Sequence, residues 1–235
     1  MELQGFAKFH HLLKLDPNPS SIGFGTKVRA GDIIRFASRV RLAKNFKGIN
    51  LEGYSQETND GYDAFFLVFL THSALERFLE INSLKLDALD SLMAPYNPEK
   101  VIQKFVEKDK KGLLYNFLYD RINDKKLKVK LSDCRSYNST NVAYISASIR
   151  HIFAHGHLCA HSNGVNPKNL YSICTSISDF LLTFMDAEFG KKIDEYYSKV
   201  YADSQVDLEA VCSESSDRKV RVVDDVLFTL GVNLP

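Results

Sequence analysis

The sequence predicts an all-α protein. Three long segments, residues 62–83, 142–153 and 170–184, carry apolar residues three or four positions apart, which is the spacing of one face of an α-helix. Stretches that look like strands are too few to build a sheet. Hydrophobic residues make up 45% of the chain and charged residues 25%, which is ordinary for a globular protein. We expect a helical bundle over residues 61–200, with residues 1–60 as an N-terminal extension and 201–235 as a tail or peripheral element.

The N-terminal extension contains a basic amphipathic segment. A short apolar segment, Phe6–Leu15, precedes a loop rich in Pro, Gly and Ser at residues 16–26, and basic residues then follow through position 47. Arg35 and Arg39 lie four positions apart, so they share one face of a helix. We predict that both bind the phosphates of a nucleic-acid substrate. The alternative is an ordinary amphipathic helix with a cationic, solvent-exposed outer face.

The first half of the bundle begins after the turn signal Asn59-Asp60-Gly61. Residues 62–83 are then expected to form a centrally buried helix that also carries Glu76. Pro98 marks the start of a helix through residue 106, and a second helix is expected at about residues 112–122. The Lys-rich segment 123–130 is predicted to be a solvated connector.

The second half of the bundle consists of two helices joined by a loop. Ser139-Thr140 is expected to cap a helix with an apolar stripe, and Asn166-Pro167 starts a second helix with the same spacing. The stripe of the first helix is formed by Val142, Ile145, Ile149, Ile152 and Phe153. The two helices should form an antiparallel hairpin.

Arg150 and His155 lie off this apolar stripe, about 140° apart around the helix, because each residue turns the helix by about 100°. Ala143, Ala147 and Ala154 lie on the opposite face. Small residues allow close approach of another helix, either a two-fold copy of this one or a helix of the same chain. The plainest alternative for Arg150 and His155 is a solvated helix face with a terminal histidine that complements the helix dipole.

The segment Arg150-His151-Ile152-Phe153-Ala154-His155 resembles the R-x4-6-H signature of the HEPN superfamily of RNases and nucleotide-binding proteins. The position after the arginine is commonly polar in that family, and here it is His151. The helix with Glu76 is similar to the first core helix of such proteins, and the resemblance covers residues 62–197. It implies a HEPN-like helical bundle.

The resemblance also implies a metal-independent endoribonuclease that acts on RNA as a homodimer. His155 would act as general base or acid, Arg150 would bind the scissile phosphate, and His151 would assist. Dimerisation would bring the arginine of one chain to the histidine of the other, and an antitoxin or regulatory protein is a further expected partner. The alternatives are a non-catalytic HEPN-like module that binds RNA, nucleotide or a protein partner, and an unrelated helical interaction protein.

No cofactor or metal is expected. His151, His155, His157 and His161 cluster with Cys159, but the pattern lacks the glutamate of H-E-x-x-H proteins and a clear third ligand. The four cysteines are widely spaced, which favours reduced thiols. The net charge of +1 speaks against general attraction to nucleic acid or membranes. Without a signal-peptide pattern or an apolar run of about 18 residues, we expect a cytoplasmic protein that spans no membrane.

Overall fold

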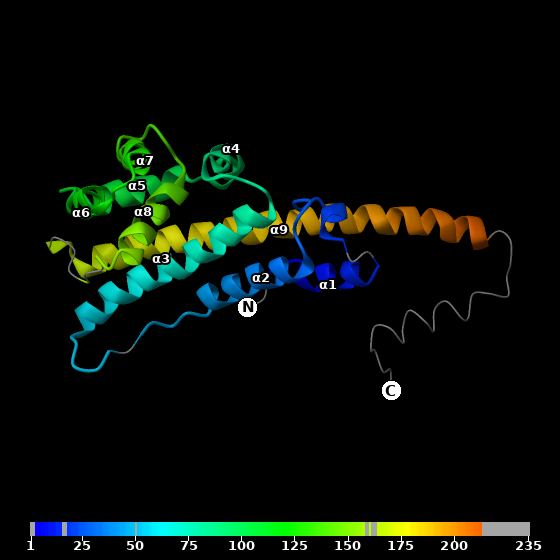
Figure 1. The fold of residues 1–235 in the computed structure, drawn as a ribbon, viewed down its shortest axis with the longest axis horizontal. Coiled ribbons are helices and arrows are strands. Elements are labelled where there is room, and N and C mark those ends of the chain that lie inside the picture. Colours follow the sequence, from blue (N-terminus) through cyan, green and yellow to red (C-terminus); the bar gives the residue numbers. More distant parts are fainter. Residues whose placement is uncertain (1–2, 16–17, 50, 158–159, 161–163, 213–235) are drawn as a thin grey trace.

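The computed structural model describes residues 3–15, 18–49, 51–157, 160 and 164–212, with the backbone alone over 201–212. Helices connected by turns and loops account for the described chain, and it contains no strand, so the all-α prediction is confirmed (Figure 1). The helices are α1 (Phe6–Leu15), α2 (Ala30–Lys44), α3 (Gln56–Ile81), α4 (Leu89–Met93), α5 (Glu99–Lys108), α6 (Leu113–Arg121), α7 (Lys125–Arg135), α8 (Val142–Ala154) and α9 (Pro167–Cys212). Three single 3-10 turns, η1 (Pro19–Ile22), η2 (Leu86–Ala88) and η3 (Ala94–Tyr96), lie between them.

The two longest helices, α3 and α9, form the centre of the fold. Their mutual contact is the most extensive in the molecule, with α2 packed along α3 and α5 along α9 (Figure 1). The predicted stripe of the last helix is buried as expected, since Ile173, Ile177 and Leu181 are all inaccessible to solvent. On α3 the residues with helical spacing, including Phe65 and Leu75, meet them in the same core.

The N-terminal helices also contribute to this core. Phe9 of α1 and Phe36 of α2 are fully buried, and their rings lie 6.1 Å and 5.7 Å from the ring of Phe189 on α9. The expected boundary at residue 60 falls inside α3, which starts after the N-cap Ser55. The described residues before position 60 therefore share one hydrophobic core with the rest of the described chain.

Two expected loops are helical. Residues 125–135 form α7, because Asp124 caps its N-terminus while Leu131 and Cys134 are buried. Helix α9 continues without interruption through Gly190 to Cys212, so the part of the expected tail before residue 213 is helical. A Cβ at Gly190 would lie 3.2 Å from the Gln4 side chain, so this glycine allows the N-terminal chain to approach α9 closely. The remaining tail, residues 213–235, lies outside the described residues.

Cys134 and Cys174 are free, buried thiols, as expected for reduced cysteines. Burial raises the pKa of the Cys134 thiol to about 12, which keeps it protonated and unreactive. Across the described part of the chain, no helix combines the length and the apolar character needed to cross a membrane.

Candidate functional site

Helix α8 carries the predicted motif, and its two ends lie in different environments. Every residue from Val142 to Ile149 is buried, because α3, α6, α7 and α9 all contact this helix. Among residues 150–157 only Ile152 is buried, and Ala154 and His155 are exposed. Any chemistry of α8 with a solvent-borne substrate therefore belongs to its last turn and a half.

The start of α8 is fixed by Asn141, which replaces the expected Ser139-Thr140 pair as the N-cap. Its side-chain oxygen accepts the backbone N–H of Ala143 at 3.0 Å, and its side-chain nitrogen donates to the Leu86 carbonyl at 3.0 Å. Asn141 is buried, so both bonds are protected from water. Together with the hydrogen bond from Tyr144 to Asp87, Asn141 links the start of α8 to the turn η2.

The alanine face is covered by this chain rather than by a second copy. Ala143 is inaccessible to solvent and Ala147 is only 8% exposed, whereas Ala154 is exposed. The expectation of a two-fold helix contact through Ala143 and Ala147 is therefore wrong. The alternative, contact with helices of the same chain, is the one that the structure has.

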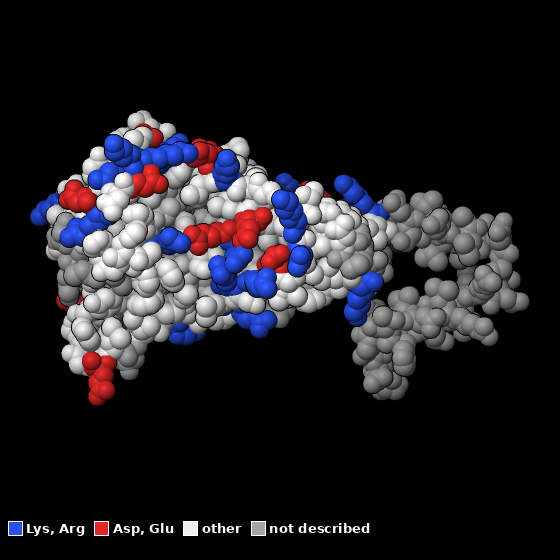
Figure 2. All heavy atoms as spheres, viewed as in Figure 1, with Lys and Arg blue, Asp and Glu red and all other residues white. Residues whose placement is uncertain are grey.

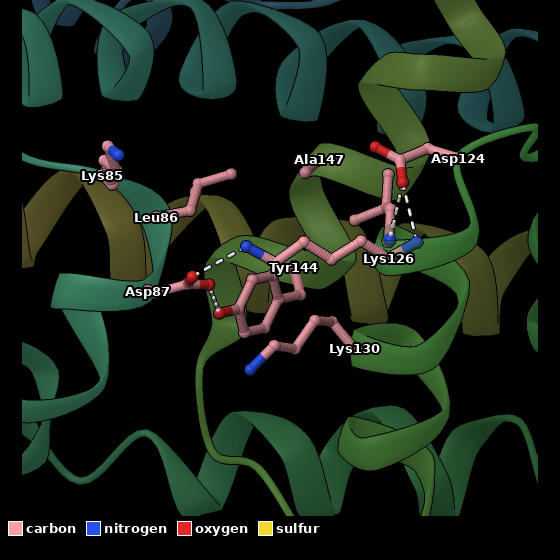
Figure 3. Close-up of a pocket in the computed structure, with 9 residues that line it drawn as sticks. Lys85, Leu86, Asp87, Asp124, Lys126, Lys130, Tyr144 and Ala147 are labelled. Atoms are coloured by element: carbon pink, nitrogen blue, oxygen red, sulfur yellow. Dashed lines mark hydrogen bonds and ion pairs between the residues drawn. The ribbon is translucent and has the colours of Figure 1, made fainter.

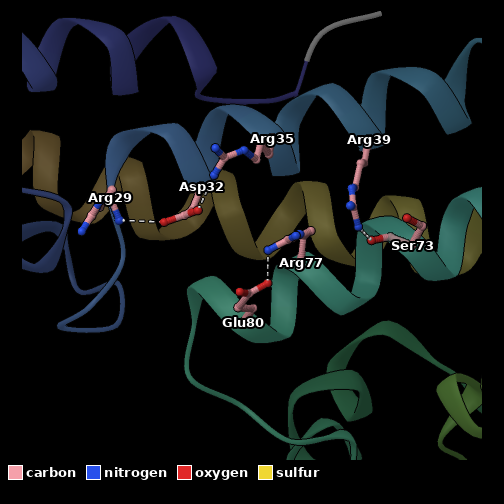
Figure 4. Close-up of polar contacts among 7 residues, drawn as sticks. All are labelled: Arg29, Asp32, Arg35, Arg39, Ser73, Arg77 and Glu80. Carbon is pink, nitrogen blue, oxygen red and sulfur yellow. Dashed lines mark hydrogen bonds and ion pairs between the residues drawn. The ribbon is translucent and has the colours of Figure 1, made fainter.

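Arg150 forms an ion pair with Glu76 of α3. Its Nη2 atom lies 3.1 Å from Glu76 Oε1, and the two side chains are 42% and 44% exposed. The neighbouring Arg77 pairs instead with Glu80, one turn along the same helix (Figure 4). The resemblance singled out Glu76 and Arg150 separately, and tertiary packing makes them partners.

A buried polar pair lies one helical turn below this ion pair. His72 Nδ1 is 2.9 Å from Ser146 Oγ, and both residues are buried between α3 and α8. Burial, reinforced by the nearby positive charge of Arg150, lowers the pKa of His72 to about 3. His72 is therefore neutral at physiological pH and serves as an interhelical hydrogen-bonding group.

His151 and His155 lie side by side at the end of α8, with ring centroids 4.5 Å apart. The backbone N–H of Asn123 donates to His151 Nε2 at 3.4 Å, so the neutral ring carries its proton on Nδ1. Burial, followed by the charge of His155, lowers the pKa of His151. His151 is thus held as a neutral hydrogen-bond donor beside the exposed His155.

Arg150 points away from this histidine pair, toward α3. Phe153, on the α3 side of the same turn, stacks on Phe69 with a centroid distance of 4.2 Å and meets Phe66 edge-on at 5.0 Å. One chain therefore brings His151 and His155 together and holds Arg150 with Glu76 on another side of the helix.

The loop after α8 returns to the start of α3. A Cβ at Gly61 would lie 2.6 Å from the carbonyl oxygen of Ala160, and Ala160 is 2% exposed. Only glycine permits so close a contact at this position. The chain that follows His155 is thereby attached to α3 at one point.

The two arginines of the basic segment lie on α2 and make local contacts (Figure 4). Arg35 pairs with Asp32 at 2.8 Å but keeps 65% of its side chain exposed. Arg39 donates to the Ser73 carbonyl of α3 at 3.0 Å, so it links α2 to α3. Of the two predicted phosphate-binding residues, Arg35 is the more accessible.

Charge is mixed over the surface around these elements. Figure 2 shows Lys and Arg interspersed with Asp and Glu on the face drawn, with large uncharged areas between them. Substrate recognition would then depend on local groups rather than on a broad positive field.

Two members of the predicted histidine and cysteine cluster, Cys159 and His161, lie outside the described residues. Within the described ranges, no group of three His, Cys, Asp or Glu side chains is arranged to hold a metal ion.

Comparison of the chain with protein-family models, with curated proteins and with solved structures finds no match.

Proposed function

We propose that the protein is a metal-independent endoribonuclease of HEPN type, with the exposed end of α8 as its catalytic element. The observation that carries the proposal is the His151–His155 pair, two imidazoles 4.5 Å apart at the point where α8 leaves the core. Imidazole is the side chain best suited to move protons near neutral pH. Arg150, five residues before His155, supplies the positive charge that a phosphodiester requires.

The reaction is a transesterification that needs no metal. His155 accepts the proton of a ribose 2′-OH, and the resulting oxygen attacks the adjacent phosphorus. The bond from phosphorus to the 5′-oxygen breaks, that oxygen takes up a proton from the protonated His155 or from water, and a 2′,3′-cyclic phosphate remains. His151 donates from Nδ1 to orient His155 or a phosphate oxygen, since its Nε2 is occupied by Asn123. Arg150 stabilises the developing charge on the phosphate.

Arg150 can exchange its partner when RNA binds. Its ion pair with Glu76 is about half exposed, and such surface pairs stabilise a protein by only about 0–1 kcal/mol. A phosphate that offers bidentate hydrogen bonds is a competitive replacement for the carboxylate. The exposed Arg35 on α2 is proposed to extend the contact with RNA.

We further propose a homodimer, because Arg150 and His155 of one chain lie on different sides of α8. A two-fold contact at the exposed end of the helix, around Ala154, would place the arginine of each chain next to the histidine of its partner. Ala154→Trp is then expected to give a folded monomer, measured by light scattering. We place the activity in the cytoplasm, where buried thiols such as Cys134 remain reduced.

The test is cleavage of RNA in EDTA with analysis of the ends. The wild-type protein should leave 2′,3′-cyclic phosphates, and His155→Ala should lower the rate by about 10²–10⁴-fold, the usual contribution of a general acid or base. The matched control is His10→Ala, which removes an exposed histidine on α1. Cleavage by His155→Ala at the wild-type rate would exclude the proposed role.

Mixing two inactive variants tests the shared site. If each site takes Arg150 from one chain and His155 from the other, a heterodimer of Arg150→Ala and His155→Ala contains one intact site. Random exchange of subunits should then restore about a quarter of the wild-type activity. No recovery in a mixture shown to contain heterodimers would mean that the site does not span two chains.

The runner-up is a non-catalytic module that binds RNA, nucleotide or a protein partner. The observation that favours it is the Glu76–Arg150 pair, which already neutralises the arginine. If the protein is such a module, the wild type cleaves no RNA, and His155→Ala binds RNA as tightly as the wild type does.

A further inference from the structure

A cavity of about 290 Å³ opens between α7, α8 and the turn η2. Its inner surface is apolar, formed by Leu86, Leu127, Ala147 and the ring of Tyr144, and three lysines surround it (Figure 3). Ligand pockets typically measure about 300–1,000 Å³, so this one is large enough for a single small ligand.

The carboxylates of the cavity are already hydrogen-bonded within the protein. Asp87 accepts a hydrogen bond from the Tyr144 hydroxyl and one from Lys126 Nζ at 2.9 Å (Figure 3). These two bonds lower the pKa of Asp87, which fixes it as an anion. Asp124 accepts the backbone N–H groups of Lys126 and Leu127 as the N-cap of α7.

The lysines of the cavity are held less firmly by partners within the protein. Lys130 Nζ lies 5.1 Å from the centre of the Tyr144 ring, and Lys85 lies across the cavity from it (Figure 3). Among the described residues, the ion pair of Asp87 is with Lys126, while Lys130 acts on Asp87 only through its charge, as the weakest of the causes that lower the pKa of that carboxyl. The Lys126–Asp87 pair is largely exposed and so holds Lys126 only weakly. An anion that enters the cavity can therefore be met by up to three ammonium groups.

The cavity lies on the same face of α8 as the candidate catalytic element. Tyr144, Ala147, His151 and His155 follow each other along α8 at intervals of three and four residues, so they form one stripe. Asn123, which hydrogen-bonds His151, is adjacent to the cavity residue Asp124. Ala147 and His151 are four residues apart, which corresponds to about 6 Å along the helix axis.

We infer that this cavity binds one nucleotide of the RNA substrate, the one adjacent to the scissile phosphate. The apolar inner surface takes the base and ribose, while Lys85 and Lys130 contact the phosphate. The neighbouring phosphodiester then lies at His151 and His155. This inference rests on the proposed function, to which it adds a subsite that determines base preference.

The experiment is a calorimetric titration of the wild-type protein with each ribonucleoside monophosphate, with the four nucleosides and with inorganic phosphate. A monophosphate should bind more tightly than either its nucleoside or inorganic phosphate, because only the monophosphate uses both the apolar surface and the lysines. Equal affinity for phosphate and nucleotide would reduce the cavity to a simple anion site and overturn the inference. No binding by any monophosphate would overturn it as well.

Two variants locate the binding. Lys130→Met should weaken nucleotide binding by about tenfold or more, because it removes a hydrogen bond to a charged group. Ala147→Leu should have a similar effect by filling the cavity. The matched control is Lys125→Met, which removes an exposed lysine from the same helix outside the cavity. Wild-type affinity in Lys130→Met, which alters only a partly exposed side chain, would overturn the inference even if Ala147→Leu fails to fold.

RNA cleavage by the same variants separates this inference from the proposed function. In one outcome the protein cleaves RNA while both variants, Lys130→Met and Ala147→Leu, keep the wild-type KM and base preference. That result would overturn the subsite and uphold the proposed endoribonuclease. Nucleotide binding with the expected dependence on Lys130, in a protein that cleaves no RNA, would uphold the nucleotide site and refute the endoribonuclease.

Discussion

Two polar links join α3 to α8, one helical turn apart, and they differ in charge. The first link, His72–Ser146, is buried and neutral. The second, Glu76–Arg150, lies nearer the end of α8 and is about half exposed and ionic. The spacing is the same on both helices, from 72 to 76 and from 146 to 150. The difference follows from solvent access, because a buried charge needs strong compensation and a surface charge does not.

The comparison divides α8 into a structural half and an accessible half. In the buried half, polar groups are neutral and satisfied, and small residues such as Ala143 serve close packing. In the accessible half, Arg150 and His155 keep contact with water and can be reached by a substrate. The variants below test whether that division is real.

The largest expected effect is on stability at acid pH. The unfolded chain protonates His72 near pH 6.5, whereas the folded protein does so only near pH 3. Between these values the unfolded state binds the extra proton, so stability falls as the pH falls, by about 1.4 kcal/mol per pH unit. Urea unfolding of the wild type and of His72→Gln between pH 7 and pH 4 measures this contribution.

His72→Gln keeps a hydrogen-bonding group near Ser146 but cannot titrate. It should be less stable than the wild type at pH 7 and lose less stability on acidification. Parallel pH profiles for the two proteins would show that His72 does not stay neutral in the folded state.

A smaller effect is expected from overpacking the buried half. Ala143→Leu should cost about 1–3 kcal/mol, because the inaccessible site leaves no room for the added atoms. Ala154→Leu, the same change in the accessible half, should alter the free energy of unfolding by no more than about 0.5 kcal/mol. Thermal melts of both variants measure the difference, and equal destabilisation would contradict the division.

The smallest effect concerns the ion pair itself. A double-mutant cycle with Glu76→Gln and Arg150→Met should give a coupling energy of about 0.2–1 kcal/mol, the usual value for an exposed pair. Arg150→Met is nevertheless expected to reduce RNA cleavage strongly, whereas Glu76→Gln should not. Loss of stability well above this range would assign Arg150 a structural role instead.

Much of the fold could be predicted from local patterns. The apolar spacing in residues 62–83, 142–153 and 170–184 predicted α3, α8 and α9, and α5 and α6 begin and end within about two residues of the expected bounds. Helix α7 was missed, because it is rich in lysine and only two of its residues, Leu131 and Cys134, are buried. The continuation of α9 beyond residue 200 was missed because its sequence there is polar and weakly patterned.

The candidate site was predictable only in part. The off-stripe positions of Arg150 and His155 follow from helical geometry and agree with their exposure. The pairing of His151 with His155 follows from their spacing of four residues. Nothing local indicated the partners of Glu76 and His72, or the cavity at Ala147, because each involves elements far apart in the chain.

The sequence by itself determined that α3, α8 and α9 are helices and which stripe of each is buried, because both depend on the fixed geometry of 3.6 residues per turn. The tertiary structure alone decided what lies against the second face of α8. Alanine is equally compatible with a helix of the same chain and with a second copy, so the sequence could not tell which of the two covers Ala143 and Ala147. In the structure α8 packs against α3, α6, α7 and α9, and both alanines are buried within the chain. The same long-range packing buries Ile152 but leaves Arg150 partly exposed and His155 exposed at the end of α8, and that is where the proposed chemistry lies.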